Sequence, residues 1–96
     1  MAKKIKTKIE VLPTREQIGE HNDGAMFAEG FDDCLLGIVE RFGAPALALY
    51  DRERVIEKLM KRDDMARDVA EEFFDFNIIG AWVGENTPAF ATILRK

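Results

Sequence analysis

The sequence predicts an α+β fold, in which a small antiparallel sheet packs on an antiparallel pair of helices in the order β-β-α-α-β. Three observations predict it. Short apolar runs interrupted by glycine and proline occupy residues 31–50. Helical periodicity extends over residues 51–81, and a last apolar run covers residues 89–94. The sheet has three strands, or four if the N-terminal arm contributes one.

The length of 96 residues fits one domain, which we divide into an arm over residues 1–30 and a compact α+β domain over residues 31–96. The hydrophobic fraction of 47% argues against global disorder. The single cysteine, Cys34, allows no disulfide within the chain, which is typical of a reducing cytosol. The sequence contains neither a secretory signal nor a membrane-spanning run, so we expect a cytoplasmic protein with no membrane partner.

The arm begins with apolar and charged residues in alternation. Period-2 alternation over residues 4–11 predicts a strand with one solvent-exposed face, and lysines on that face are typical of an edge strand. Pro13 ends this strand, and Thr14 with Gln17 forms a weak capping-box pattern that could start one helical turn. Residues 19–30 contain three glycines and little periodicity, which indicates a loop.

Two further strands are predicted before the helices. The apolar run of residues 34–39 suits a strand covered on both faces. Gly43 and Pro45 then indicate a hairpin. Residues 46–50 fit either a second strand or the start of the next helix, and the strand is favoured because Asp51 is the better N-cap.

The two helices are predicted from apolar stripes. The first follows Asp51, and the second is expected to be capped by Asp63 and Asp64. Spacings of four, four, three and four residues place Met65, Val69, Phe73, Phe76 and Gly80 on one face of the second helix, which we expect to be buried. The predicted core comprises Leu36, Ile38, Leu47, Leu49, Ile56, Leu59, Met60, Val69, Phe73, Phe76, Ile79 and Phe90.

The stretch that ends the second helix, FDFNIIGAWVGENTP, reads as a helix-to-strand turn. Gly84 stands where a left-handed residue is usual after a helix, and Pro88 prevents the helix from resuming. Gly80 is expected to let the helix approach its neighbour closely. Trp82 is expected to be half-buried, and Asn77 to be buried with loop backbone as its partner.

The strings YDRERVIEKLMKRDDM and EEFFDFNIIGAWVGENTPAF resemble a family of small, mostly uncharacterised proteins of phages and prophages. The likeness spans residues 31–94. It implies a phage or mobile-element setting, hence the cytoplasm of the host cell, and no reaction. The chain departs from the family pattern by Arg54, where lysine is usual, and by its long arm. The matching residues are Tyr50, Asp51, Ile56, Glu57, Leu59, Met60, Phe74, Phe76, Asn77, Gly80, Ala81, Val83, Gly84, Glu85, Thr87, Pro88 and Phe90.

Catalytic and metal-binding patterns are weak throughout the chain. One histidine, His21, and one cysteine supply too few ligands for a zinc site, and no glycine-rich phosphate loop occurs. Cys34 inside an apolar run is best explained as an inert small hydrophobic residue. Asp32 and Asp33 are expected to shape the entry to the strand. We therefore predict no catalytic, cofactor-binding or metal-binding residue, and no enzyme.

The function favoured by the sequence is protein–protein binding by an accessory protein that modulates or inhibits a host or defence factor. Its predicted partner contacts are Trp82, Glu85, Asn86 and Thr87, an aromatic anchor beside a polar rim. Turn chemistry alone favours the alternative that the polar residues of this loop shape its turn. The alternative is a nucleic-acid-associated protein that uses the basic arm, with Lys3, Lys4, Lys6 and Lys8 as contacts. The net charge of −4 disfavours that alternative. A small enzyme ranks third, and self-association through the edge strand or the Trp82 region is left open.

Overall fold

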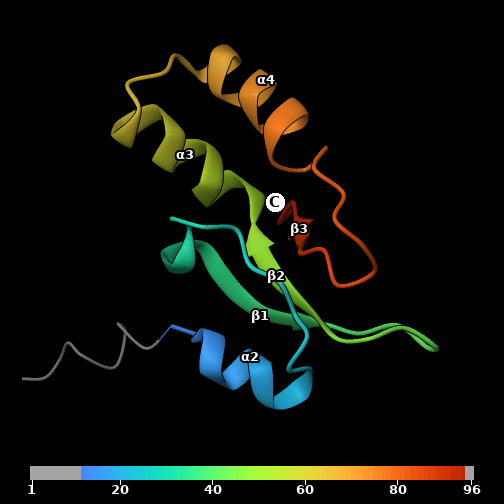
Figure 1. The fold of residues 1–96 in the computed structure, drawn as a ribbon. Coiled ribbons are helices and arrows are strands. Elements are labelled where there is room, and N and C mark those ends of the chain that lie inside the picture. Colours follow the sequence, from blue (N-terminus) through green and yellow to red (C-terminus); the bar gives the residue numbers. More distant parts are fainter. Residues whose placement is uncertain (1–11, 95–96) are drawn as a thin grey trace, which may run out of the picture.

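Residues 12–94 are described by a computed structural model of the chain. In chain order the elements are α2 (Arg15–His21), the 3-10 turn η1 (Asp32–Cys34), β1 (Leu35–Val39), β2 (Leu47–Asp51), α3 (Arg52–Arg62), α4 (Arg67–Asn77) and β3 (Ala89–Ala91). The paired helices α3 and α4 lie at one end of the molecule and α2 at the other, with the sheet between them (Figure 1). The α+β class and the order β-β-α-α-β are confirmed. No helix in this part of the chain is both long and apolar enough to cross a membrane.

The sheet is mixed, whereas the sequence predicts an antiparallel sheet. Its strand order is β1-β2-β3, with β1 antiparallel and β3 parallel to central β2. Parallel neighbours need a crossover connection, and here α3, α4 and the returning segment 78–88 supply it (Figure 1). The choice left open for residues 46–50 is settled in favour of a strand, because Asp51 caps α3 by accepting the backbone N–H of Glu53 at 3.0 Å.

The core differs from the predicted one mainly at α4. Ile56 and Leu59 are buried as predicted, and Ile38, Met60 and Phe90 pack partly buried against the core. Leu36, Leu47 and Leu49 are only half-buried. The prediction is wrong for Val69, Phe73, Phe76 and Ile79, which are exposed. The buried cluster comprises Ile18, Phe31, Cys34, Leu35, Ala48, Tyr50, Val55, Ile56, Leu59, Ala70 and Phe74.

The rotation of α4 about its own axis explains those errors. Ala70 and Phe74, four residues apart, face the core and have no exposed surface. The helix is also shorter than predicted, because it begins after Ala66 without a side-chain cap and ends at Asn77. Asp63 instead ends α3, and Asp64 takes a left-handed conformation (φ 56°) in the turn between the helices. The expected capping role of the two aspartates was therefore wrong.

The segment before η1 packs on the same core as the rest. The capping box of Thr14 and Gln17 is present, and it starts a seven-residue helix rather than a single turn. Ile18 of that helix is buried, and Phe27 and Ala28 of the following loop pack against the core. The domain boundary at residue 30 stays a prediction. The strand predicted within residues 1–11 lies outside the described part of the chain.

Tyr50 on β2 connects three segments that are distant in sequence. It has no exposed surface, its ring stacks on Phe90 with 5.3 Å between centroids, and its hydroxyl accepts the backbone N–H of Ala28 at 2.8 Å. Burial raises the pKa of the Tyr50 phenol. Phe90 in turn meets Phe74 edge-on at 5.1 Å, so this aromatic series runs from the central strand to α4.

The segment after α4 is shaped by Gly80 rather than by the predicted close helix–sheet approach. A Cβ at Gly80 would lie 2.7 Å from the carbonyl oxygen of Asp75, so the chain folds back over the last turn of its own helix. Trp82 is 74% exposed, so the expectation that it is half-buried was wrong. Asn77 is likewise exposed instead of buried. Gly84 does adopt the predicted positive φ, at 115°.

Gly80→Ala is expected to destabilise the protein by about 1–3 kcal/mol, because the backbone carbonyl of Asp75 cannot move aside as a flexible side chain would. Gly19→Ala is the matched control. It lies inside α2 with nothing within 4 Å of the added Cβ, so it should stabilise the protein by about 0.5–1 kcal/mol. Urea unfolding measures both. Equal effects of the two substitutions would contradict the proposed role of Gly80.

Tyr50→Phe is expected to cost about 1–3 kcal/mol of unfolding free energy, because it leaves the backbone N–H of Ala28 without its acceptor while the ring stacking remains. Urea unfolding gives the free energy, and amide exchange at Ala28 should accelerate in the variant. An unchanged unfolding midpoint would show that water replaces the hydroxyl at no cost.

Candidate functional site

The outward surface of α4 carries an apolar row beside an acidic row. Val69, Phe73 and Phe76 follow one another at spacings of four and three residues, and they are 49%, 37% and 74% exposed. Each is preceded by an exposed carboxylate, so the second row lies directly alongside the first. We call this surface the α4 face, and its members are Val69, Phe73, Phe76, Asp68, Glu72 and Asp75.

The α4 face is held outward by contacts between α4 and α3. Both carboxylate oxygens of Glu53 on α3 accept from Arg67 at 2.7 Å. The guanidinium of Arg52 lies 4.9 Å from the ring centroid of buried Phe74 and 3.7 Å from a carboxylate oxygen of Asp75. Hydrogen bonding to Arg67 lowers the pKa of Glu53, and hydrogen bonding to Glu53 raises the pKa of Arg67. These contacts fix the rotation of α4 that exposes the aromatic rings.

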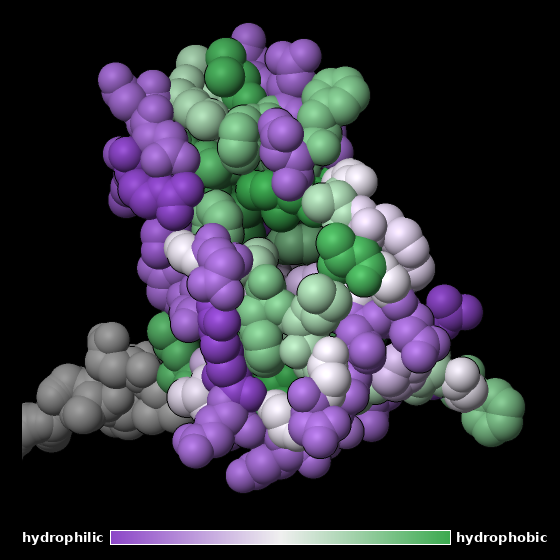
Figure 2. Space-filling view, in the orientation of Figure 1, coloured by the Kyte–Doolittle hydropathy of each residue, from purple (hydrophilic) through white to green (hydrophobic). Residues whose placement is uncertain are grey.

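A hollow of about 430 Å³ borders the α4 face, with which it shares Phe73, and lies between the loop before η1, α4 and the returning segment. Figure 2 shows it as apolar surface flanked by hydrophilic residues. Its only charged lining residues are Glu29 and Arg62. We call it the apolar groove, and its remaining lining residues are Met26, Phe27, Ala28, Phe31, Phe73, Asn77, Ile78, Ala81, Val83, Thr87, Pro88 and Phe90.

The predicted contact residues of the GENTP loop fall into two groups. Trp82 and Glu85 are exposed and can reach a partner. Asn86 and Thr87 are instead used inside the fold. The side-chain oxygen of Asn86 accepts from Asn22 at 2.9 Å, and the hydroxyl of Thr87 accepts the N–H of Val83 at 2.9 Å and donates to the carbonyl of Gly84 at 2.6 Å.

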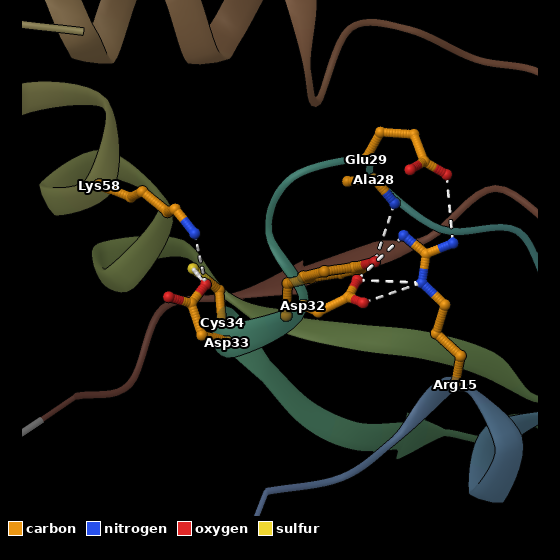
Figure 3. Close-up of polar contacts among 8 residues, drawn as sticks. Arg15, Ala28, Glu29, Asp32, Asp33, Cys34 and Lys58 are labelled. Carbon is orange, nitrogen blue, oxygen red and sulfur yellow. Dashed lines mark hydrogen bonds and ion pairs between the residues drawn. The ribbon is translucent and has the colours of Figure 1, made fainter. Parts of the chain in front are cut away.

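The carboxylates around η1 belong to ion pairs rather than to a shared acid–base site. Asp32 and Glu29 both bind Arg15, at 2.9 and 3.1 Å. Asp33 accepts from Lys58 of α3 at 2.9 Å, and this hydrogen bond lowers the pKa of Asp33 (Figure 3). The neighbouring carboxylates thus point to different cations, and they tie η1 to α2 on one side and to α3 on the other.

Cys34 is a poor nucleophile in this setting. Burial, followed by the nearby charge of Asp33, raises the pKa of the thiol to about 12, so it stays protonated at neutral pH. A shallow hollow of about 420 Å³ beside it is rich in titratable groups: Asp33, Arg54, Glu57, Lys58, Lys61 and Arg62. Among residues 12–94 no three His, Cys, Asp or Glu side chains are grouped to hold a metal ion.

Two exposed features were not recognised in the sequence. The stripe of α4 was identified but assigned to the core, because the helix carries apolar residues on two adjacent faces. Phe42 is fully exposed at the end of the β1–β2 hairpin, and its position beside Gly43 in the predicted turn was the available signal. Lys3, Lys4, Lys6 and Lys8, the predicted nucleic-acid contacts, lie outside the described residues.

Comparison of the chain with protein families, with curated proteins and with solved structures finds no match in any of the three. The resemblance to the phage family therefore stays a prediction.

Glu53→Gln is expected to reduce the fall in unfolding free energy that the protein shows as the pH is lowered into the acid range. Because the folded-state pKa of Glu53 lies below its ordinary value of 4.5, its contribution is present above that pH and is lost as pH falls through the folded value. The pair is half-exposed, so the difference should be at most about 1 kcal/mol.

Unfolding free energies at pH 7 and pH 3 provide the measurement. The gap between wild type and Glu53→Gln should be present at pH 7 and narrow as the pH is lowered to 3. Glu57→Gln, on the same helix and without an ion pair among the described residues, is the control. A gap as large at pH 3 as at pH 7 would refute the assignment.

Proposed function

We propose that the protein is a phage- or prophage-type accessory protein that acts in the host cytoplasm by binding another protein through the α4 face. The observation that supports this most directly is the exposure of Val69, Phe73 and Phe76 on one helical surface. An exposed apolar row with a polar border is typical of a docking surface. The resemblance to phage proteins supports the setting, in which the partner is a host or phage protein whose activity is modulated or inhibited.

The chemistry of the partner follows from the two rows. Aromatic rings of Phe73 and Phe76 supply anchors, each worth about 1.5–3 kcal/mol when fully buried. The parallel acidic row, Asp68, Glu72 and Asp75, favours a partner that carries lysine or arginine beside its own apolar stripe. A basic amphipathic helix presents both rows at the same spacing. Trp82 and Glu85 lie in the segment that follows and are available to extend the contact.

The direct test is an NMR titration of the folded protein with two helical peptides of identical leucine pattern, one with lysines and one with glutamates on the polar face. The lysine peptide should shift amide signals of residues 68–76 and lose affinity as salt is raised. Phe76→Ser should weaken it by at least about tenfold. Because Phe76 is mostly exposed, this variant should unfold within about 0.5 kcal/mol of wild type.

Leu94→Ser is the matched control, since Leu94 is an equally apolar, exposed residue after β3. It should bind like wild type. Equal binding of the glutamate peptide, or equal losses in Phe76→Ser and Leu94→Ser, would refute the assignment. Capture from host lysate with wild type and Phe76→Ser in parallel then identifies the natural partner as the protein that only wild type retains.

A further inference from the structure

The β1–β2 hairpin carries an aromatic ring that no part of the described chain covers. Phe42 is fully exposed, and the turn is held by a hydrogen bond from the Ala44 N–H to the Arg41 carbonyl at 3.1 Å. Gly43 adopts the positive φ of 78° that the turn requires. The hairpin projects beyond the body of the molecule (Figure 1), so the ring is presented at the end of a structured extension.

We propose that Phe42 of one copy inserts into the apolar groove of a second copy of this chain. The groove, of about 430 Å³, falls within the range of about 300–1,000 Å³ typical of sites that enclose drug-sized ligands, so one phenyl ring and its flanking residues fit. Its lining residues are apolar except for Glu29, Arg62, Asn77 and Thr87, a composition that suits an aromatic anchor.

The charged residues of the hairpin end are complementary to those that line the groove. The two residues before Phe42 are Glu40 and Arg41, both exposed. The two charged residues of the groove are Arg62 and Glu29, so the groove and the hairpin end each carry one charge of either sign and opposite charges can pair. Glu29 is open to such a contact because its side chain is 85% exposed and binds Arg15 through Oε2. Arg62 uses Nε and Nη2 for Asp63, which leaves Nη1 outside that pair.

Both complementary parts belong to one chain, so a two-fold dimer in which each hairpin enters the other copy's groove would satisfy both. An aromatic side chain buries only about 150–250 Å², and two of them with their rims fall well short of the ~1,600 Å² of a standard stable interface. The association is therefore weak and depends on protein concentration.

Analytical ultracentrifugation from ~10 μM to ~1 mM tests the proposal on the full chain, with the concentration range set by the small interface. Wild type should self-associate, and Phe42→Ser should raise the dissociation constant at least about tenfold with an unchanged thermal melt, since Phe42 is fully exposed within residues 12–94. Val83→Glu, which alters an exposed lining residue of the groove, should do the same. Phe76→Ser, on the α4 face, should associate like wild type.

A wild type that is monomeric at every concentration, or a Phe42→Ser variant that associates like wild type, overturns the proposal. Loss of association in Phe76→Ser alone also overturns it, because the α4 face would then be the contact between copies. The inference uses the hairpin and the groove, so monomeric wild type leaves peptide binding at the α4 face unaffected.

Discussion

The buried ring of Tyr50 is the contact on which the arrangement of the other elements depends. It lies on the central strand, supplies the hydrogen-bond acceptor for the loop before η1, and stacks on the ring of Phe90 in β3. Phe90 then meets Phe74, so the position of α4 over the sheet follows from the same series of rings. The backbone N–H of Ala28 needs an acceptor, and the phenol oxygen of Tyr50 supplies it.

The inward position of Phe74 has a direct consequence for the surface. Residues 69–76 carry apolar side chains on two adjacent helical faces, and only one of them can contact the sheet and α3. Phe74 and Ala70 occupy the inner face, with Arg52 stacked on the Phe74 ring and Arg67 bound to Glu53. The larger row of Val69, Phe73 and Phe76 is left outside. The helix thus buries Ala70 and one phenylalanine and exposes a valine and two phenylalanines, and an exposed apolar row of this kind is typical of a docking surface.

The sequence predicted the class, the element order, the capping box of Thr14 and the N-cap of Asp51, because each depends on residues close together in the chain. It did not predict which face of α4 is buried, because periodicity identifies stripes but does not rank two stripes that compete for the same core. Thr87 bonds only to Val83 and Gly84 in its own turn, whereas the exposure of Trp82 and the bond of Asn86 to Asn22 depend on where the returning segment lies. That position follows from the parallel pairing of β3, a long-range contact without a local signal.

The parallel pairing of β2 and β3 also affects the order in which the chain folds. The β1–β2 hairpin and the α3–α4 pair join neighbouring segments and close short loops, so they form at small entropic cost. Tyr50 and Phe90 are separated by both helices, and their rings meet only after those helices have been placed. We therefore expect attachment of β3 to be the late, slow step of folding, and its three-residue pairing to be the part of the sheet that detaches first under stress.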